Sequence, residues 1–130
     1  PFCHGLIAYA RTPEIRDKMQ QVQSLVADQV PPPEAAWRLG QSVAVHESLP
    51  FALYAFLRHP QSFEACLLCA ALNGGDRDTL GAMAGAVSGA YLGIDAIPHA
   101  WRAKLENHQY IEILAHNLAE LAEAQTKTPH

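Results

Sequence analysis

Three oxygen-bearing side chains follow a pair of glycines near the middle of the chain. Asp76, Asp78 and Thr79 come directly after Gly74 and Gly75, and glycine permits backbone conformations that other residues resist. One aspartate is a favoured helix N-cap, and a helix N-terminus stabilises a nearby carboxylate. Two carboxylates and a hydroxyl exceed what capping needs, and hard cations such as Mg²⁺ bind clusters of oxygen ligands. This segment, residues 74–79, which we name the acidic turn, therefore has two interpretations of similar weight: part of a magnesium site, or a helix cap.

A helix rich in small residues is predicted after the acidic turn. Gly81, Gly85 and Gly89 recur at every fourth position, with alanine and serine among the residues between them. Glycine inside a helix destabilises it by about 0.5–1 kcal/mol relative to alanine, so three glycines need a compensating contact. We expect a buried central helix from about Leu80 to Leu92, ended by Gly93, with its glycines close to a neighbouring helix. Such burial would hold the acidic turn rigidly.

The other elements that must position this turn are also predicted to be helices. Prolines and serines mark several of their starts, because proline is tolerated in the first turn and serine is a good N-cap. The expected helices are Pro13 to Asp28, Glu34 to Leu39, one capped by Ser48 with Pro50 in its first turn, one capped by Ser62 and running to Leu72, a short one from Pro98, and Gln109 to Gln125. No alternating β-pattern competes with them. The sequence predicts an all-α fold, a compact bundle of roughly six or seven helices.

Both ends of the chain carry further expectations. Residues 1–12 are interpreted as the tail of an element that begins upstream. The apolar residues of the last predicted helix recur at helical spacing and should face inward. These residues are Ile111, Leu114, Ala115, Leu118 and Leu121. The chain starts at Pro1, with neither a methionine nor a signal-like segment, so we expect a piece of a longer polypeptide.

The composition argues against several classes of protein. The 130 residues fit one domain, and 49% hydrophobic with 17% charged residues is ordinary for a globular protein. A formal net charge of −4 argues against nucleic acid as a partner. No apolar run approaches the roughly 20 residues that a membrane span requires. Cys66 and Cys69 lie in an apolar helical segment without a second pair to complete a zinc site, so we expect buried reduced thiols and a cytoplasmic protein.

Two short motifs are incomplete. His46 and Glu47 begin a zinc-protease pattern, but Pro50 stands where the second histidine is needed. The Asp-x-Asp of the acidic turn opens an EF-hand loop, which would need an acidic or amide residue where Leu80 stands. Glu47 is chemically able to act in catalysis, but its place just before a proline-started helix favours a first-turn helix acid.

Two blocks of the sequence resemble one family. One is the run Gly-Gly-Asp-Arg-Asp-Thr with the small-residue helix to Gly93, followed by Ala-Ile-Pro-His-Ala-Trp ending at Trp101. It resembles the C-terminal signature of the ADP-ribosylglycohydrolases. The other block, Leu39 to Leu57, contains Gly-Gln-Ser-Val-Ala and then Glu-Ser-Leu-Pro-Phe-Ala, and it is similar to a further segment of that family. The resemblance extends from about Leu39 to Leu118.

The resemblance implies a function and a set of site residues. Members are all-α hydrolases that remove ADP-ribose from a modified protein or small molecule, usually with two Mg²⁺ ions. Asp76, Asp78 and Thr79 match half of the metal cluster in that family. The loop that lines the ADP-ribose pocket is matched by Gly40, Gln41, Ser42 and Val43. Arg77 stands where a small residue is usual and Ser42 where glycine is frequent, but neither change removes a metal ligand.

The resemblance also implies that part of the site lies outside this chain. The family's other acidic metal cluster and its catalytic glutamate belong to an N-terminal half, and this chain has no Asp-Asp pair. Residues 1–130 are therefore expected to be the C-terminal portion of a larger orthogonal helical domain. The chain would need the N-terminal half, covalently joined or as another chain, and by itself should release no ADP-ribose. The alternative is a non-catalytic helical scaffold of the same fold. The linkage that is cleaved stays open among arginine, serine and small ADP-ribosyl metabolites.

Overall fold

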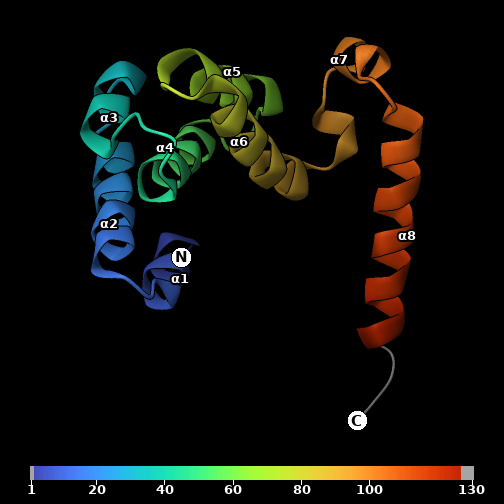
Figure 1. Ribbon diagram of the computed structural model, residues 1–130, viewed down its shortest axis with the longest axis horizontal. Helices are drawn as coiled ribbons and strands as arrows, with labels where there is room; N and C mark the ends of the chain where they lie inside the picture. Colours follow the sequence, from blue (N-terminus) through green and yellow to red (C-terminus); the bar gives the residue numbers. More distant parts are fainter. Residues whose placement is uncertain (1, 127–130) are drawn as a thin grey trace. The chain divides into compact units, whose positions relative to one another are not determined.

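The computed structural model describes residues 2–126, and these residues form α-helices without any β-strand. The helices are α1 (Phe2–Tyr9), α2 (Pro13–Ala27), α3 (Pro32–Leu39), α4 (Val45–Arg58), α5 (Phe63–Asn73), α6 (Arg77–Leu92), the 3₁₀-helix η1 (Ile94–Ala96), α7 (His99–Lys104) and α8 (His108–Thr126) (Figure 1). The all-α prediction is confirmed. Two elements were not among those expected: α1, in the segment interpreted as the tail of an earlier element, and the short 3₁₀-helix η1.

The chain divides into two compact units. The first ends at Ile97 and contains α1 to α6 and η1, and the second begins at Pro98 and contains α7 and α8. Among residues 2–126, no helix is both long enough and apolar enough to cross a membrane.

The core of the first unit is organised around α4. Phe51, Tyr54 and Ala55 of this helix are almost completely buried, and α4 packs against α2, α3, α5 and α6. The Tyr54 hydroxyl donates a hydrogen bond to the carbonyl oxygen of Val30. This bond satisfies the polar end of a buried ring, so the aromatic side chain stabilises the core without an unpaired hydroxyl.

α6 is half-buried, so the expectation that it is the buried central helix was wrong. Only Leu80, Ala84 and Ser88 are buried, while the alanines on another face of the helix are exposed. Small side chains remove little apolar area from water, and the large apolar side chains that drive burial are concentrated in α4. The glycines do face a neighbouring helix, because a Cβ atom on Gly85 would lie 3.3 Å from Leu67 Cδ1 of α5.

α4 begins earlier than predicted. It starts at Val45 with Ala44 as its N-cap, so Ser48 is not the cap and Pro50 lies inside the helix. The carbonyl oxygen of Ala44 already accepts hydrogen bonds from the N–H groups of Glu47 and Ser48, each at 2.9 Å. The buried Ser48 hydroxyl donates to the same carbonyl at 3.2 Å. Ser48 therefore stabilises the first turn of the helix from within.

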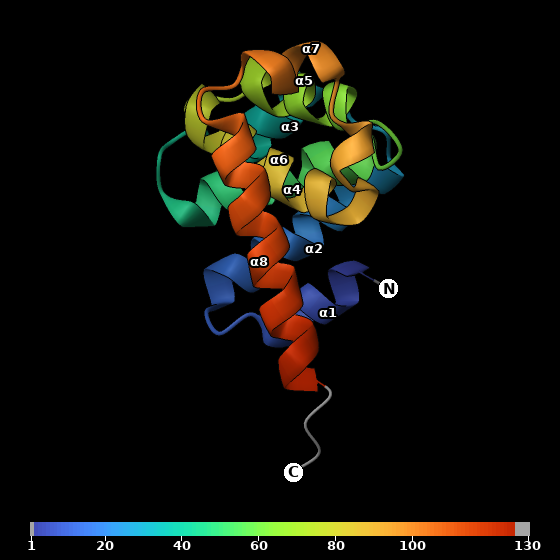
Figure 2. The same cartoon turned by 90° about the vertical axis from the view of Figure 1, so that its right-hand side faces the viewer.

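In the second unit, α8 is one continuous helix in both views (Figure 2). Its apolar residues were expected to face inward, but they are exposed. They are Ile111, Leu114, Ala115, Leu118 and Leu121. In the described part of this unit α8 packs only against α7, and a helix of 6 residues is too short to cover an apolar face of that length.

Candidate functional site

The acidic turn forms the N-terminus of α6. Asp76 is the N-cap, and its Oδ1 accepts a long hydrogen bond of 3.5 Å from the Thr79 N–H. The Asp78 carboxylate accepts from the same N–H at 3.1 Å. A hydrogen bond with the Asp76 carboxyl lowers the pKa of Asp78, and the backbone N–H groups of Asp78 and Thr79 lower it further. The two carboxyl groups therefore lie next to each other at the positive end of the helix dipole.

Gly75 brings the acidic turn against a second segment, the connection between α3 and α4. We name this connection, residues 40–44, the Gly40 loop. A Cβ atom on Gly75 would lie 2.2 Å from the carbonyl oxygen of Gln41 and 3.2 Å from its carbonyl carbon. These are backbone atoms, so only glycine permits the approach. Two segments that lie far apart in the sequence, and that were singled out separately, are thus direct neighbours.

Side chains of α4 hold the Gly40 loop in place. Gly40 ends α3 with a φ of +106°, a conformation that residues with a side chain rarely adopt. The N–H of Ser42 donates to Glu47 Oε2 at 2.8 Å, and the Ser42 hydroxyl oxygen accepts from the Ala44 N–H at 3.2 Å. The loop therefore has a defined shape although it belongs to no helix.

Three other residues of the candidate site have simpler surroundings. Val43 is 77% exposed on the Gly40 loop. Arg77 is exposed at the first position of α6, between the two aspartates. Thr79 is half-buried, and its N–H is the donor that the two carboxylates share.

Two further residues, Glu47 and Lys18, contact the segment around the Gly40 loop, although no sequence motif placed them in the site. Glu47 lies in the first turn of α4, as predicted, but its carboxylate also contacts the Gly40 loop. Hydrogen bonds from the backbone N–H of Ser42, and then from its side chain, lower the pKa of Glu47, and His46 and Lys18 lower it further by their charge. Lys18 Nζ donates to the carbonyl oxygen of Leu39 at 2.6 Å. The Glu-Ser-Leu-Pro motif of the block from Leu39 to Leu57 contains Glu47 and could have indicated its role. Nothing in the sequence indicates a role for Lys18, because its acceptor is a backbone carbonyl of a distant segment.

The donor atoms of the acidic turn fit a hard divalent cation. Carboxylate oxygens are the ligands that Mg²⁺ prefers, and two carboxyl groups side by side offer a divalent cation two such ligands. Among residues 2–126, no three His, Cys, Asp or Glu side chains lie close enough together to hold a metal ion. Two adjacent carboxylates would leave most of a six-coordinate shell to other ligands.

The cysteines of α5 are not part of this site. Cys66 and Cys69 are buried and unpaired, which confirms the prediction of buried reduced thiols. Burial raises the pKa of both thiols, that of Cys69 to about 11. A protonated buried thiol is a poor nucleophile and a poor metal ligand, so these residues act in packing.

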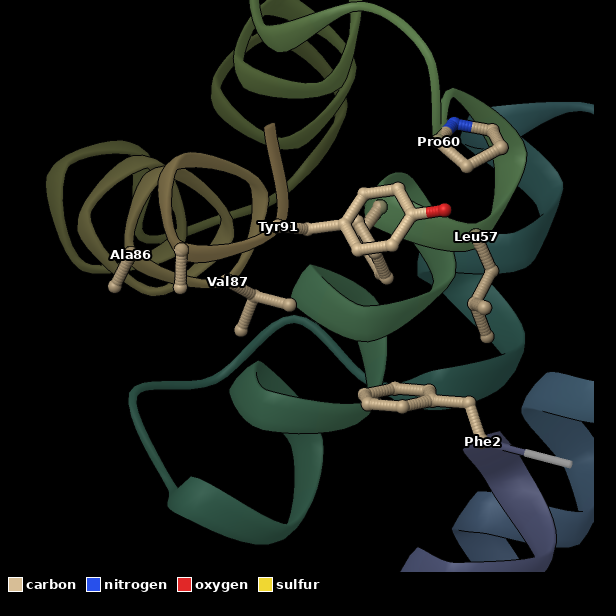
Figure 3. A pocket seen from close by; sticks show the side chains of 8 residues that line it. Phe2, Leu57, Pro60, Ala86, Val87 and Tyr91 are labelled. Carbon is tan, nitrogen blue, oxygen red and sulfur yellow. The ribbon is translucent and has the colours of Figure 1, made fainter. Parts of the chain in front are cut away.

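A cavity of about 670 Å³ lies toward the other end of α6 (Figure 3). Its lining is apolar except for one tyrosine hydroxyl, and consists of Phe2, Phe56, Leu57, Pro60, Ala86, Val87, Ala90 and Tyr91. The Phe56 ring centroid lies 5.8 Å from that of Phe2 and 5.6 Å from that of Tyr91, edge-on to both. Such a lining offers nothing that would bind a phosphate or a metal. This apolar hollow and the polar side chains of the acidic turn therefore lie at different ends of the same helix.

Comparison with known proteins identifies the family. A model of the ADP-ribosylglycohydrolases matches residues 3–128. The chain belongs to the ADP-ribosylglycohydrolase family. The match includes both the Gly40 loop and the acidic turn, so the family assignment rests on the two segments that meet at Gly75 as well as on the helices around them.

Individual proteins match a smaller part of the chain than the family model does. ADP-ribosylhydrolase ARH3 of Mus musculus is 37% identical over 95 residues, which cover 65% of this chain and 26% of that protein. ADP-ribosylhydrolase ARH3 of Homo sapiens is 38% identical over 95 residues, with the same coverage of 65% and 26%. The ADP-ribosyl-[dinitrogen reductase] glycohydrolase of Rhodospirillum rubrum is 47% identical over 45 residues, which cover 35% of this chain and 15% of that protein. The chain spans about a quarter of the length of the ARH3 proteins. No solved structure gives a significant match.

Proposed function

We propose that this chain supplies part of an active site that hydrolyses the bond between ADP-ribose and a modified protein or small molecule. Membership of the ADP-ribosylglycohydrolase family supports this class of reaction. The observation that carries the proposal is the contact between Gly75 and the Gln41 carbonyl oxygen, which makes the acidic turn and the Gly40 loop one continuous surface. A substrate that spans both segments would have its ribose near the carboxylates.

In this proposal, Asp76, Asp78 and Thr79 hold Mg²⁺, and the complete site contains two such ions. The two adjacent carboxyl groups support this role. Bound there, the metal would orient the ribose and make a water molecule a better nucleophile for attack at the anomeric carbon. The residues themselves keep the carboxylates together at the N-terminus of α6, where the helix dipole stabilises negative charge.

Gly40, Gln41, Ser42 and Val43 bind the ADP-ribose. The Gly40 loop is tied to α4 by the Ser42–Glu47 hydrogen bond, so its shape is set before the ligand arrives. The exposed Val43 side chain offers an apolar contact at its surface. A preformed loop loses less conformational entropy on binding than a mobile one.

The remaining metal ligands and the catalytic group come from an N-terminal half, either in the same polypeptide or in another chain. The number of ligands supports this, because the acidic turn offers two carboxylates. The length of the ARH3 relatives supports it as well, since the matched region is 26% of each. We also propose a cytoplasmic location, because reduced buried thiols suit a reducing compartment.

The test compares ADP-ribose release by residues 1–130 with release by the same residues supplemented with the upstream segment, each with and without Mg²⁺. The substrates carry ADP-ribose on arginine, on serine, and on a small molecule. We expect no release by residues 1–130 alone and Mg²⁺-dependent release by the completed protein. Asp78→Asn should lower that rate by at least the roughly 10–100-fold that loss of a metal's outer-shell partner causes. Asp95→Asn, which changes an exposed aspartate in η1, is the matched control and should leave the rate unchanged.

Two outcomes would contradict the proposal in different ways. Robust release by residues 1–130 alone would show that no N-terminal half is needed. No release by the completed protein on any of the three linkages would favour a non-catalytic helical scaffold.

A further inference from the structure

The Gly40 loop is held by one carboxylate at two places. Glu47 Oε2 accepts the Ser42 N–H at 2.8 Å. The same side chain covers Gly40, where a Cβ atom would lie 2.3 Å from Glu47 Cδ and 2.5 Å from Oε2. The side chain of Glu47 therefore occupies the space that a side chain at Gly40 would need, and it spans the first half of the loop.

The loop in turn supports the acidic turn. The Gln41 carbonyl lies between the two residues that Glu47 contacts, and its oxygen is the atom packed against Gly75. Because this contact joins backbone to backbone, a shift of the loop would change the position of the turn next to Asp76. A chain of contacts thus leads from the Glu47 carboxylate, through Ser42 and Gln41, to the acidic turn.

Other groups near Glu47 do not replace this attachment. Lys18 donates a hydrogen bond to the carbonyl oxygen of Leu39, the last residue of α3, just before the loop begins. The Ser48 hydroxyl donates to the carbonyl oxygen of Ala44, the last residue of the loop. His46 Nε2 lies 3.9 Å from Glu47 Oε1, the other carboxylate oxygen. The middle of the loop is held by the Ser42–Glu47 hydrogen bond, by the Ala44–Ser42 hydrogen bond within the loop and by the Gly75 contact, and only the first of these ties it to the side chain of a helix.

We propose that Glu47 is a positioning residue for ADP-ribose binding: its carboxylate fixes the Gly40 loop beside the acidic turn. The inference rests on the proposed function, because ADP-ribose is the ligand of the loop. Glu47 acts through the loop and touches neither the reacting bond nor the metal. Its loss should therefore weaken binding and leave the chemical step nearly unchanged.

The test measures ADP-ribose affinity by calorimetry, and KM and kcat, in the completed protein. Glu47→Ala removes the acceptor, and the loss of a hydrogen bond to a charged group should weaken affinity and raise KM about tenfold, with kcat changed less than about threefold. Hydrogen exchange at the amides of residues 41–44 should become faster. Glu64→Gln is the control, because Glu64 is also a first-turn acid, in α5, but is exposed, and it should change none of these quantities.

Two conservative variants separate the effect of side-chain length from the effect of charge at position 47. They also keep the test decisive if Glu47→Ala does not fold. Glu47→Gln keeps the length of the side chain and an oxygen acceptor, so its affinity should stay within about threefold of the unaltered protein. Glu47→Asp keeps the charge but is one methylene shorter, so it should lose affinity about as much as Glu47→Ala. The opposite order would overturn the inference. So would faster exchange of the loop amides with unchanged ADP-ribose affinity. Failure of the unaltered completed protein to bind ADP-ribose would instead overturn the proposed function, together with the ligand named in this inference.

Discussion

Gly75 of the acidic turn and the glycines of α6 lie within one stretch of sequence, yet their surroundings differ. A Cβ atom on Gly75 would lie 2.2 Å from a backbone oxygen, whereas one on Gly89 would lie 3.6 Å from Phe63 Cε2. A backbone atom can move aside only if its loop moves with it, but the end of a side chain can change its rotamer or shift slightly. The turn glycine therefore fixes a contact between two parts of the candidate site. The helix glycines only make room for α5.

The largest effect should come from a side chain at the turn. Gly75→Ala places a methyl group inside the contact distance of the Gln41 carbonyl oxygen, so the turn and the Gly40 loop must separate. We expect the free energy of unfolding in urea to fall by about 3 kcal/mol. Gly5→Ala is the control, because a Cβ atom there meets nothing within 4 Å. Equal stability of the two variants would show that the contact at Gly75 yields easily.

A smaller loss of stability is expected from a large side chain on the glycine-bearing face of α6. Gly85→Leu must displace Leu67 and Phe63 of α5, whose nearest atoms would lie 3.3 Å and 3.8 Å from the new Cβ. Overpacking of this kind destabilises by about 1–3 kcal/mol. Gly85→Ala, which adds only the Cβ atom, should cost less than the leucine variant. An unchanged urea midpoint for Gly85→Leu would show that the glycine-bearing face of α6 is not packed closely against α5.

A gain in stability is expected at Gly89, which is less crowded than Gly75 and Gly85. Gly89→Ala adds a methyl group at an ordinary contact distance of 3.6 Å from Phe63. It also removes a glycine from the interior of α6, which should stabilise the helix by about 0.5–1 kcal/mol. Thermal unfolding would measure this gain. A loss as large as that of Gly75→Ala would erase the distinction between Gly75 and the glycines of α6.

The smallest effect concerns the support of the loop and depends on pH. The hydrogen bond from Ser42 lowers the pKa of Glu47 in the folded protein below its usual 4.5. The resulting stabilisation is present above the pKa of the unfolded chain and is lost as the pH falls through the lower, folded-state pKa. Glu47→Gln should therefore be less stable than the unaltered chain at pH 7, and the difference should disappear in acid. Urea unfolding of both proteins from pH 7 into acid would measure the difference in free energy of unfolding. A difference that stays constant with pH would contradict the lowered pKa of Glu47.

The sequence predicted those features that depend on local chemistry. Ser62 was expected to cap a helix, and its hydroxyl oxygen accepts the Ala65 N–H at 3.1 Å. The repeat of glycines predicted a close neighbour for α6, and Leu67 and Phe63 of α5 provide it. Residue types near the ends of helices and along one face are thus enough to predict most of the elements.

Features that depend on distant segments could not be predicted. Ser48 has the chemistry of an N-cap, but the carbonyl oxygen of Ala44 begins the helix first. The contact of Gly75 with Gln41 joins positions with no periodic relation, so no pattern in either segment indicates it. The apolar face of α8 was predicted to be inward because helical periodicity shows which residues share a face, but not what covers that face.

The central claim, that the Gly40 loop and the acidic turn form one metal-dependent site, is tested most directly by NMR with Mn²⁺. Mn²⁺ suits the same carboxylate ligands as Mg²⁺, and it broadens the signals of nearby amides. In the completed protein, Mn²⁺ should broaden the amides of residues 76–79 and 41–43 more strongly than those of Ala86 to Tyr91, which lie farther along α6. The broadening should be lost in Asp78→Asn and on competition with excess Mg²⁺. Broadening confined to another part of the chain, or unchanged in Asp78→Asn, would contradict the account.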